Sequence, residues 1–238
     1  MDNALYTGLT RQSGLNREMT VIANNIANAA TTGYRSEGVM FTEFVHAIPG
    51  NESLSMAKAN VQTTSMVQGA MTKTGGTFDF AVEGDGFFMV ETPDGERLTR
   101  AGNFTPNAQG DLVNFDGHLV LDSGGAPIFI PPDAASIDVG ADGTISADGQ
   151  LVGQIGVFEP LDPNMLNRES GVLFESPEGS ELVEGARVLQ GFLENSNVNP
   201  IDQITRMIQV QRAYEMGQSF LETEDNRVRE ALKSFVGK

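Results

Sequence analysis

The spacing of apolar residues changes twice along this chain, from helical at the start to alternating in the middle and back to helical at the end. From about residue 3 to residue 30, apolar positions recur at alternating steps of three and four residues. A second such segment runs from about residue 199 to residue 235, where Met207, Tyr214, Leu221 and Val228 lie seven residues apart. This spacing is typical of helices that pair along an apolar seam. We therefore predict that the two terminal helices pair as a coiled coil.

The predicted seam combines positions from both helices. In the second helix its alternating position is polar, at Gln211, Gln218 and Asp225, which makes the pair weak alone but selective for its partner. A two-helix pair also buries little apolar area, so we expect both helices to gain stability from neighbouring chains on assembly. The residues assigned to the seam are Leu5, Leu9, Leu15, Met19, Ile22, Ile26, Ile204, Met207, Tyr214, Leu221, Val228 and Leu232.

Between the helices the pattern favours β structure. TFDFAVEG alternates apolar and polar residues, GFFMVET is a short apolar strand, and PDGE, NAQGD, NFDGH and SADGQ supply turns. Asp-Gly and Gly-Asp pairs tolerate the positive φ that tight hairpins need. The sequence thus predicts an α+β fold with a central all-β domain of short strands and hairpins. The expected boundaries are an N-terminal helix at 1–33, an extended connector at 34–75, the β domain at 76–185, a return connector at 186–198 and a C-terminal helix at 199–238.

Charge is distributed unevenly along the chain. There are 15 basic and 32 acidic residues, a net charge of −17, of which residues 46–196 hold −16. Binding to nucleic acid or to an anionic membrane surface needs clustered Lys and Arg, so neither partner is expected. No apolar run reaches about 18 residues, so we expect no transmembrane helix. The start, MDNALYTGLTRQ, has no basic region followed by an apolar one, so we expect no cleavable secretory signal.

No constellation in the sequence indicates catalysis. Cysteine is absent, and the two histidines, His46 and His118, lie in unrelated contexts. Asp138 to Gly149 lacks the spacing and closing Glu of a calcium loop. Glu83 and Asp85 could form a glycosidase-like carboxylate pair, but turn glycines surround them. We expect no catalytic residue, metal, cofactor or small-molecule substrate, while a secreted acidic β-domain enzyme or carbohydrate-binding module stays open as an alternative.

The stretch VIANNIANAATTGYR places three amides in a helical pattern. Asn is a poor residue inside helices, because its side chain competes for backbone hydrogen bonds. A solvated helix face would favour Glu, Lys or Gln instead. We therefore expect Asn24, Asn25 and Asn28 to form uncharged hydrogen bonds with packed neighbours, and we assign them to contacts between subunits.

Three stretches together resemble one known family. VIANNIANAATTGYR resembles the N-terminal signature of the axial proteins of the bacterial flagellum, the rod and hook family. FDFAVEGDGFFMVETPDGERLTRAGNFTPNAQGDLVNFDGHLVL resembles the family's central motif, and LENSNVNPIDQITRMIQVQRAYE its C-terminal signature. They lie at both ends and in the middle of the chain, in the family's order. The most distinctive central residues are Gly84, Asp85, Gly86, Phe87 and Phe88, which we expect to specify a strand of the β domain.

The resemblance implies a structural protein without catalysis. It implies a subunit of the flagellar basal-body rod that transmits torque from motor to hook through its terminal helices. The implied partners are copies of itself, other rod proteins and the flagellar type III export apparatus, and the implied location is the periplasmic part of the rod. The short chain with one modest β domain is more similar to proximal-rod members. QRAYE is also typical of distal-rod members, so a distal-rod or hook-junction subunit stays the alternative.

Overall fold

A computed structural model of the chain describes residues 2–46 and 54–236, with side chains over 7–40 and 63–234. The chain divides into two compact units. The helical unit comprises Met1–Ala27, Glu37–Thr63 and Asn199–Lys238, and the β unit comprises Asn28–Ser36 and Thr64–Val198. The predicted α+β class is confirmed, because the terminal helices contact each other and the segment between them forms short antiparallel strands.

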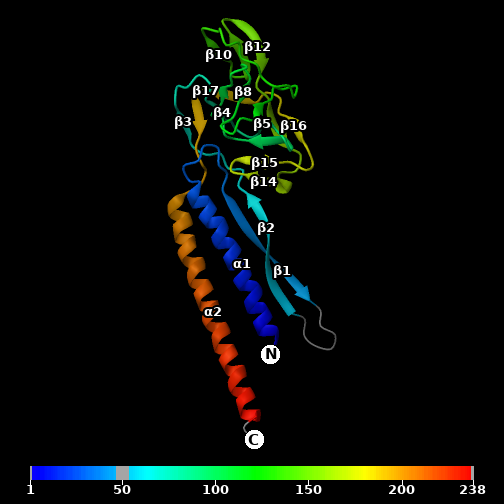
Figure 1. Cartoon of the computed structure of the whole chain (residues 1–238), viewed down its shortest axis with the longest axis vertical. Coiled ribbons are helices and arrows are strands. Elements are labelled where there is room, and N and C mark those ends of the chain that lie inside the picture. The colour runs from blue at the N-terminus through cyan, green and yellow to red at the C-terminus, as the bar shows by residue number, and fades with distance from the viewer. Residues whose placement is uncertain (1, 47–53, 237–238) are drawn as a thin grey trace. The chain divides into compact units, whose positions relative to one another are not determined.

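The helical unit contains α1 (Asp2–Ala27), α2 (Pro200–Val236) and the pair β1 (Glu37–His46) and β2 (Leu54–Thr64). The two helices run side by side, and β1 lies against α1 (Figure 1). Asn199 caps α2, since its Oδ1 accepts the N–H of Ile201 at 3.1 Å. Pro200 occupies the first helical position, where its missing N–H has no intrahelical partner to lose.

The β unit is organised around one antiparallel sheet with the strand order β14-β15-β6-β5-β9-β8-β7, to which β13 adds on β5 and β16 on β13. Its strands are β5 (Phe87–Thr92), β6 (Gly95–Thr99), β7 (Thr105–Pro106), β8 (Leu112–Val113), β9 (Leu119–Val120), β13 (Val157–Pro160), β14 (Asn167–Ser170), β15 (Leu173–Glu175) and β16 (Ser180–Leu182). The remaining elements are β3 (Met71–Lys73), β4 (Phe80–Glu83), β10 (Ile137–Val139), β11 (Thr144–Ala147), β12 (Gln150–Gln154), the 3-10 turn Pro163–Met165, β17 (Arg187–Gln190) and β18 (Phe192–Glu194).

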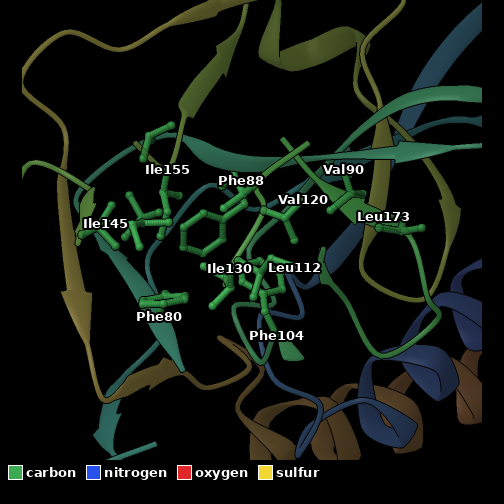
Figure 2. Close-up of a cluster of buried hydrophobic side chains, with 14 residues drawn as sticks. Phe80, Phe88, Val90, Phe104, Leu112, Val120, Ile130, Ile145, Ile155 and Leu173 are labelled. Atoms are coloured by element: carbon green, nitrogen blue, oxygen red, sulfur yellow. The ribbon is translucent and has the colours of Figure 1, made fainter. Parts of the chain in front are cut away.

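The core of the β unit lies on both faces of β5. Successive strand residues point to opposite faces, so Phe88 and Val90 join one buried cluster while Phe87 and Met89 join another. In the first cluster the rings of Phe88 and Phe104 meet edge to face at 5.3 Å (Figure 2). A strand buried on both faces is apolar throughout, which accounts for the run GFFMV.

Three hairpin turns are closed in the same way, by a side-chain oxygen that accepts backbone hydrogen bonds. In each turn one Oδ1 accepts the backbone N–H groups of the residues two and four positions later, at 2.8–3.0 Å. The accepting residues are Asn107, Asn114 and Asp122. A short side chain that mimics a backbone acceptor closes a tight turn without further residues. These are the turns that NAQGD and NFDGH predict, with a third at Asp122.

Three expected boundaries differ in the structure. The first helix ends at Ala27 rather than near residue 33, because Gly33 turns with φ of 69° and donates its N–H to the carbonyl of Glu194 at 2.8 Å. The expected connector at 34–75 contains β1, β2 and β3, and the return connector at 186–198 contains β17 and β18. β3, β17 and β18 have only three or four residues each, too few to show a pattern. β1 and β2, with 10 and 11 residues, are long strands that the sequence analysis did not recognise.

Candidate assembly surface

The contact between the helices centres on three buried apolar residues. Leu15 and Ile22 of α1 meet Val210 of α2, at 9%, 4% and 2% exposure. Four further predicted seam residues pack against them, namely Met19, Ile26, Met207 and Tyr214. Half of the predicted seam therefore gathers in one intrachain cluster, and Val210 was not among the predicted residues.

The register of α2 differs from the expected one. Gln211, Gln218 and Asp225, the predicted polar seam positions, are exposed. The stripe facing α1 instead carries Val210 and, half-buried, Gly217 one heptad further. Steps of three and four alternate in a heptad, so a residue three or four positions after Met207 fits the pattern equally well. Only the facing helix decides between them.

Two glycines allow the helices to approach closely. A Cβ added at Gly8 of α1 would lie 2.8 Å from Cδ2 of Leu221, and one added at Gly217 of α2 would lie 2.8 Å from Nε2 of Gln12. Gln12 uses this space to donate its Nε2–H to the carbonyl of Tyr214 at 2.9 Å. These contacts fix the register along the pair, because a shifted helix would present side chains at both close approaches.

An ion pair joins the same two helices. Arg206 of α2 contacts Oε1 of Glu18 through Nε at 2.7 Å and Nη2 at 2.6 Å. Glu18 is only 8% exposed, so removal of Arg206 would leave a carboxylate largely out of water. The pair therefore favours this arrangement of α1 and α2 over other registers.

Several predicted seam residues are not buried in the single chain. Leu9, Ile204 and Leu232 are 55%, 50% and 59% exposed, while Leu221 and Val228 are half-buried. Leu5 lies in α1, but its side chain falls outside the described residues. These residues leave apolar surface on both helices that the chain does not cover by itself.

One group of exposed residues forms a patch on α2, which we call the outer patch. It consists of Ile201, Ile204 and Ile208, at 75%, 50% and 46% exposure. Their spacing of three and four places them on one helix face, and the 100° turn per residue puts that face opposite Val210. Three isoleucines on one face form an apolar patch that the single chain leaves uncovered.

The three amides have different surroundings. Asn25 is 1% exposed and pairs with the backbone of Glu37, the first residue of β1: its Nδ2 donates to the carbonyl at 2.8 Å and its Oδ1 accepts the N–H at 2.9 Å. Asn28 accepts a hydrogen bond from the Thr31 hydroxyl at 3.1 Å, which helps close the turn after α1. Asn24 is exposed. Asn25 and Asn28 therefore have hydrogen-bond partners within the chain, and the subunit contacts that the sequence predicts for the three amides stay a prediction.

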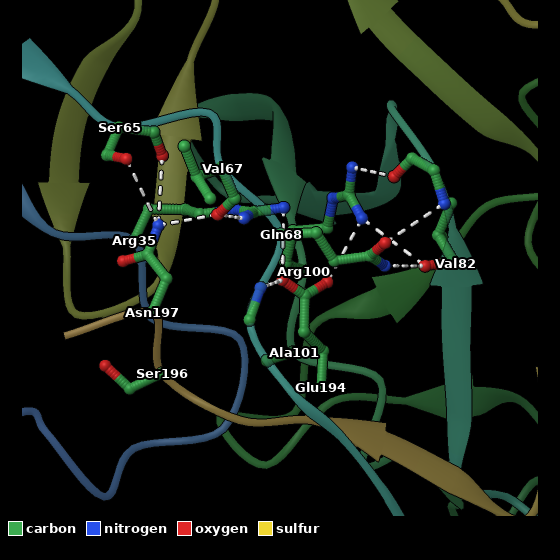
Figure 3. A network of polar contacts seen from close by, with 12 residues as sticks. Arg35, Ser65, Val67, Gln68, Val82, Arg100, Ala101, Glu194, Ser196 and Asn197 are labelled. Carbon is green, nitrogen blue, oxygen red and sulfur yellow. Dashed lines mark hydrogen bonds and ion pairs between the residues drawn. The ribbon is translucent and has the colours of Figure 1, made fainter. Parts of the chain in front are cut away.

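A buried ion cluster lies in the β unit (Figure 3). The carboxylate of Glu194 binds Nη2 of Arg35 through Oε1 and Nη1 of Arg100 through Oε2, each at 3.1 Å. All three side chains are 1% exposed. Gly69 donates its N–H to Oε1 of Glu194 at 2.9 Å, which adds to the support of the carboxylate.

The cluster joins chain segments that are far apart in sequence. Arg100 donates through Nη2 to the carbonyl of Gly84 at 2.7 Å, and Arg35 donates to the carbonyl of Val67. Gln68 donates its Nε2–H to the carbonyl of Val82 at 2.6 Å beside them. Arg35, Arg100 and Glu194 belong to the N-terminal, central and C-terminal motif stretches, respectively. The three motifs therefore meet at one point of the fold.

Burial perturbs both arginines of the cluster. Removal from water, and secondly the charge of Arg100, lowers the pKa of Arg35 to about 10. Burial is also the largest cause of the lowered pKa of Arg100. The carboxylates of Glu194 and Asp85 oppose this shift at both residues. Two guanidinium groups that share one buried carboxylate depend strongly on it, since an unpaired buried charge is costly.

The central motif shapes the start of β5. Gly84 and Gly86 have φ of 92° and 102°, and a Cβ on Gly86 would lie 2.5 Å from Cγ1 of Val157. Phe87 and Phe88 are fully buried, on opposite faces of the strand. Asp85 is exposed on the turn between the glycines. The motif thus sets a turn and a two-faced strand, as a fold-specifying element should.

Sequence reasoning missed the cluster residues Arg35, Arg100 and Glu194. Each stands inside a quoted motif; Arg35 and Arg100 lie next to buried residues, whereas the neighbours of Glu194 are half-buried and exposed. For the two arginines, a charged residue within an otherwise buried stretch was the available signal. It could indicate a buried ion pair, but not which distant residues form it.

Other site chemistries find no support in the part of the chain that the structure describes. There is no group of three or more His, Cys, Asp or Glu residues able to hold a metal ion among the described residues. No helix within those residues is both long and apolar enough to span a bilayer. Glu83, one half of the alternative carboxylate pair, forms an exposed ion pair with Arg187 at 2.8 Å.

Comparison with known families matches three parts of the chain. Residues 5–35 match the flagella basal body rod protein family, and residues 81–147 match the flagellar hook protein FlgE/F/G D1 domain. Residues 189–233 match the C-terminal region of flagellar basal body rod FlgEFG proteins. These ranges contain most of α1, much of the β unit and most of α2.

Individual relatives match over most or all of their length. The chain is 39% identical to the flagellar basal-body rod protein FlgF of Mesorhizobium japonicum over 241 residues, covering all of both chains. It is 42% identical to FlgF of Caulobacter vibrioides over 90% of both chains. It is 33% identical to the rod protein FlgG of Bacillus subtilis over 98% of both chains.

Proposed function

This chain belongs to the flagellar basal-body rod FlgE/F/G family, and on that premise we propose that it occupies the proximal part of the rod and transmits torque from motor to hook. It is a FlgF-like structural subunit of the rod and not an enzyme. The observation that carries the proposal is the outer patch, together with the other apolar residues of α1 and α2 that the single chain leaves exposed.

The charges of the two units support helix-mediated assembly. The helical unit has nine basic and eleven acidic residues, whereas the β unit has six basic and twenty-one acidic residues. Many copies can bring nearly neutral helices together, but they repel one another where net charge is high. We therefore assign the crowded contacts of the rod to α1 and α2.

Family membership implies assembly with other rod proteins. The finer proposal is that the chain also binds copies of itself through the outer patch, Leu9 and Leu232. Export through the flagellar type III apparatus without a cleavable signal would deliver it to the periplasmic part of the rod. Of the predicted amides, Asn24 is the exposed one on α1, while Asn25 is buried.

Replacement of the outer patch tests this assignment. The Ile201→Ser, Ile204→Ser, Ile208→Ser triple variant should keep the circular dichroism and melting temperature of the monomer, because these side chains are at least 46% exposed. Cells carrying it should not swim, and their basal bodies should lack the variant chain. Gln211→Ser, an exposed change in the same part of α2, should be neutral. A motile triple variant would overturn helix-mediated assembly through this patch.

Electron microscopy of basal bodies from a deletion strain tests the position. Basal bodies without a rod beyond the inner-membrane ring, in non-motile cells, would support the proximal position. Rods that stop short of the hook would instead indicate a distal-rod or hook-junction subunit. The similarity to FlgG keeps that second candidate in view. Intact flagella in swimming cells would contradict both positions.

A further inference from the structure

A single amide of the β unit, that of Asn197, lies beside three of the passages by which the chain goes from one unit to the other. These passages follow Ala27, Ser36, Thr63 and Val198. Asn197 accepts the N–H of Ser36 through Oδ1 at 2.6 Å and donates through Nδ2 to the carbonyl of Val67 at 2.7 Å. Its Nδ2 also donates to the carbonyl of Ser65 at 3.4 Å (Figure 3). Asn197 therefore bonds to the ends of two other β-unit segments besides its own.

Further hydrogen bonds tie these segment ends to one another. Ser65 donates its N–H to the carbonyl of Ser36 at 2.8 Å. Arg35, which belongs to the buried ion cluster, donates to the carbonyl of Val67, the same group that accepts from Asn197. We call Ser36, Ser65, Val67 and Asn197 the exit cluster. The exit cluster is thus bonded directly to the buried ion cluster.

Two of the segments also lie at backbone contact distance just beyond the exit cluster. A Cβ added at Gly69 would lie 2.0 Å from the carbonyl oxygen of Asn195, so a side chain there would push the segments apart. Asn195 donates its N–H to the carbonyl of Ala70 at 2.9 Å. The segments that Asn197 joins are therefore held together on both sides of it.

Such bonds affect how a force passes through the chain. A segment end without lateral bonds opens locally at low cost and carries a force alone. Segment ends that are bonded to one another must move together, so they share the force. Each hydrogen bond contributes little by itself, and the effect of a side chain that bonds to several segments comes mainly from their coupling.

We propose that Asn197 is a positioning residue that couples three segments of the chain, so that load passes between the units through all three together. The inference deepens the proposed function and rests on it, because a subunit that transmits torque carries load along these segments. Asn suits this position, since its amide both donates and accepts hydrogen bonds without bringing a further charge beside the buried ion cluster.

Hydrogen exchange in the full-length monomer tests the coupling. Asn197→Ala removes the acceptor of the Ser36 N–H, so faster exchange at Ser36 follows directly from the substitution. The N–H of Ser65 is bonded to the carbonyl of Ser36 and not to Asn197, so its exchange reports the link between segments. We expect exchange at Ser65 to become about five- to tenfold faster, as for one lost hydrogen bond. The amides of β5 should keep their wild-type rates.

Asn195→Ala is the matched control, two residues earlier in the same segment. Asn195 is exposed, and its Nδ2 donates to Oγ1 of Thr72 at 2.8 Å, away from the exit cluster. This variant should leave exchange at Ser65 unchanged. If Asn197→Ala accelerates Ser36 alone, Asn197 holds only one segment and the proposal is overturned. If β5 loses protection to the same extent as Ser65, Asn197 supports the whole unit instead, which also overturns it.

Swimming in media of increasing viscosity tests the role under load. Cells with Asn197→Ala should assemble the chain into basal bodies and swim normally in dilute medium, but lose speed more steeply than wild type as viscosity rises. Cells with Asn195→Ala should follow wild type throughout. Identical curves for Asn197→Ala and wild type, or absence of this variant alone from basal bodies, would overturn the role under load. Absence of the wild-type chain from basal bodies would instead refute the rod function, whatever the exchange result.

Discussion

The two units of this chain bury their apolar residues to very different degrees. In the β unit, clusters of fourteen and seven buried residues enclose β5 from both faces. In the helical unit, the described side chains form one cluster with three buried residues, while the outer patch and Leu9 stay exposed. The β unit therefore has the core of an independent domain, whereas the helices leave apolar surface that the single chain does not cover.

This difference separates stability from assembly. A unit with a complete core can fold before it meets its neighbours, and its contacts with them can stay small. A helix pair with a narrow seam gains more from each neighbour that covers its free faces. We expect hydrogen exchange in the monomer to be fast in α1 and α2 and slow in β5 and β6, and to slow in the helices on assembly.

The largest effect is expected in the β unit. Glu194→Ala leaves two buried guanidinium groups without their carboxylate, which should cost about 3–5 kcal/mol. Denaturant unfolding, with hydrogen exchange to locate the loss in the β unit, measures this change. Glu184→Ala, an exposed change in the same unit, should stay within about 0.5 kcal/mol. Wild-type unfolding of the Glu194 variant would show that the cluster does not support the unit.

The next effect is expected in the helical unit. Asn25→Ala leaves the N–H and carbonyl of Glu37 without their side-chain partner, at a cost of about 1–3 kcal/mol. Asn25→Asp keeps the acceptor for the N–H but loses the donor, so it should fall in between at neutral pH. Hydrogen exchange of the Glu37 amide follows the effect. Asn24→Ala, an exposed change on the same helix, should cost less than Asn25→Ala, and equal effects of both changes would contradict the larger intrachain role of Asn25.

A smaller effect distinguishes the two faces of α2. Val210→Ala removes two methyl groups from the seam and should weaken the helix pair by roughly 1.6 kcal/mol, at about 0.8 kcal/mol per methyl-sized group. Ile208→Ala, on the outer patch, should leave the monomer unchanged and reduce incorporation into rods. Monomer melting and recovery in basal bodies measure the two effects. If Ile208→Ala destabilised the monomer and Val210→Ala only reduced incorporation into rods, the proposed roles of the two faces would be wrong.

The smallest effect concerns a turn of the β unit and depends on pH. Backbone N–H groups, that of Ser136 first and that of Ala135 second, hold the pKa of Asp148 below its ordinary value of 3.8. A carboxylate with a lowered pKa in the folded state stabilises it above pH 3.8, and this contribution is lost as pH falls through the lowered value. Asp148→Asn should therefore melt slightly below wild type at pH 6, and the difference should shrink below about pH 4. A constant difference from pH 6 to pH 3 would contradict this role.

Features that depend on residues close together in the sequence could be predicted, whereas features that depend on distant segments could not. Helix periodicity and Asp-Gly turns depend on residues within a few positions, so both helices and the hairpins could be predicted. The register of α2 could not, because Val210 and Gln211 fit one heptad pattern and only Gln12 and Leu15 of α1 distinguish them.

The polar part of the candidate site was harder still. Asn25 was singled out correctly as unusual, but its partner Glu37 is a backbone group, which leaves no mark on the sequence. Arg35, Arg100 and Glu194 stand 65 and 94 residues apart along the chain, and no local pattern links them. The uneven distribution of charge, by contrast, can be read directly from the sequence, and the two units of the structure differ in net charge accordingly.

The buried ion cluster has a consequence for how such chains can be recombined. Arg35 and Glu194 place the last residues before β1 and the last residues before α2 inside the β unit, whose limits are Ser36 and Val198. A graft cut at the end of α1 and at the start of β3 would separate the carboxylate of Glu194 from the guanidinium of Arg35. Exchange of whole β units between relatives should succeed when the junctions follow Ala27, Ser36, Thr63 and Val198. The family could then diversify its subunits by module exchange while keeping a common helical framework.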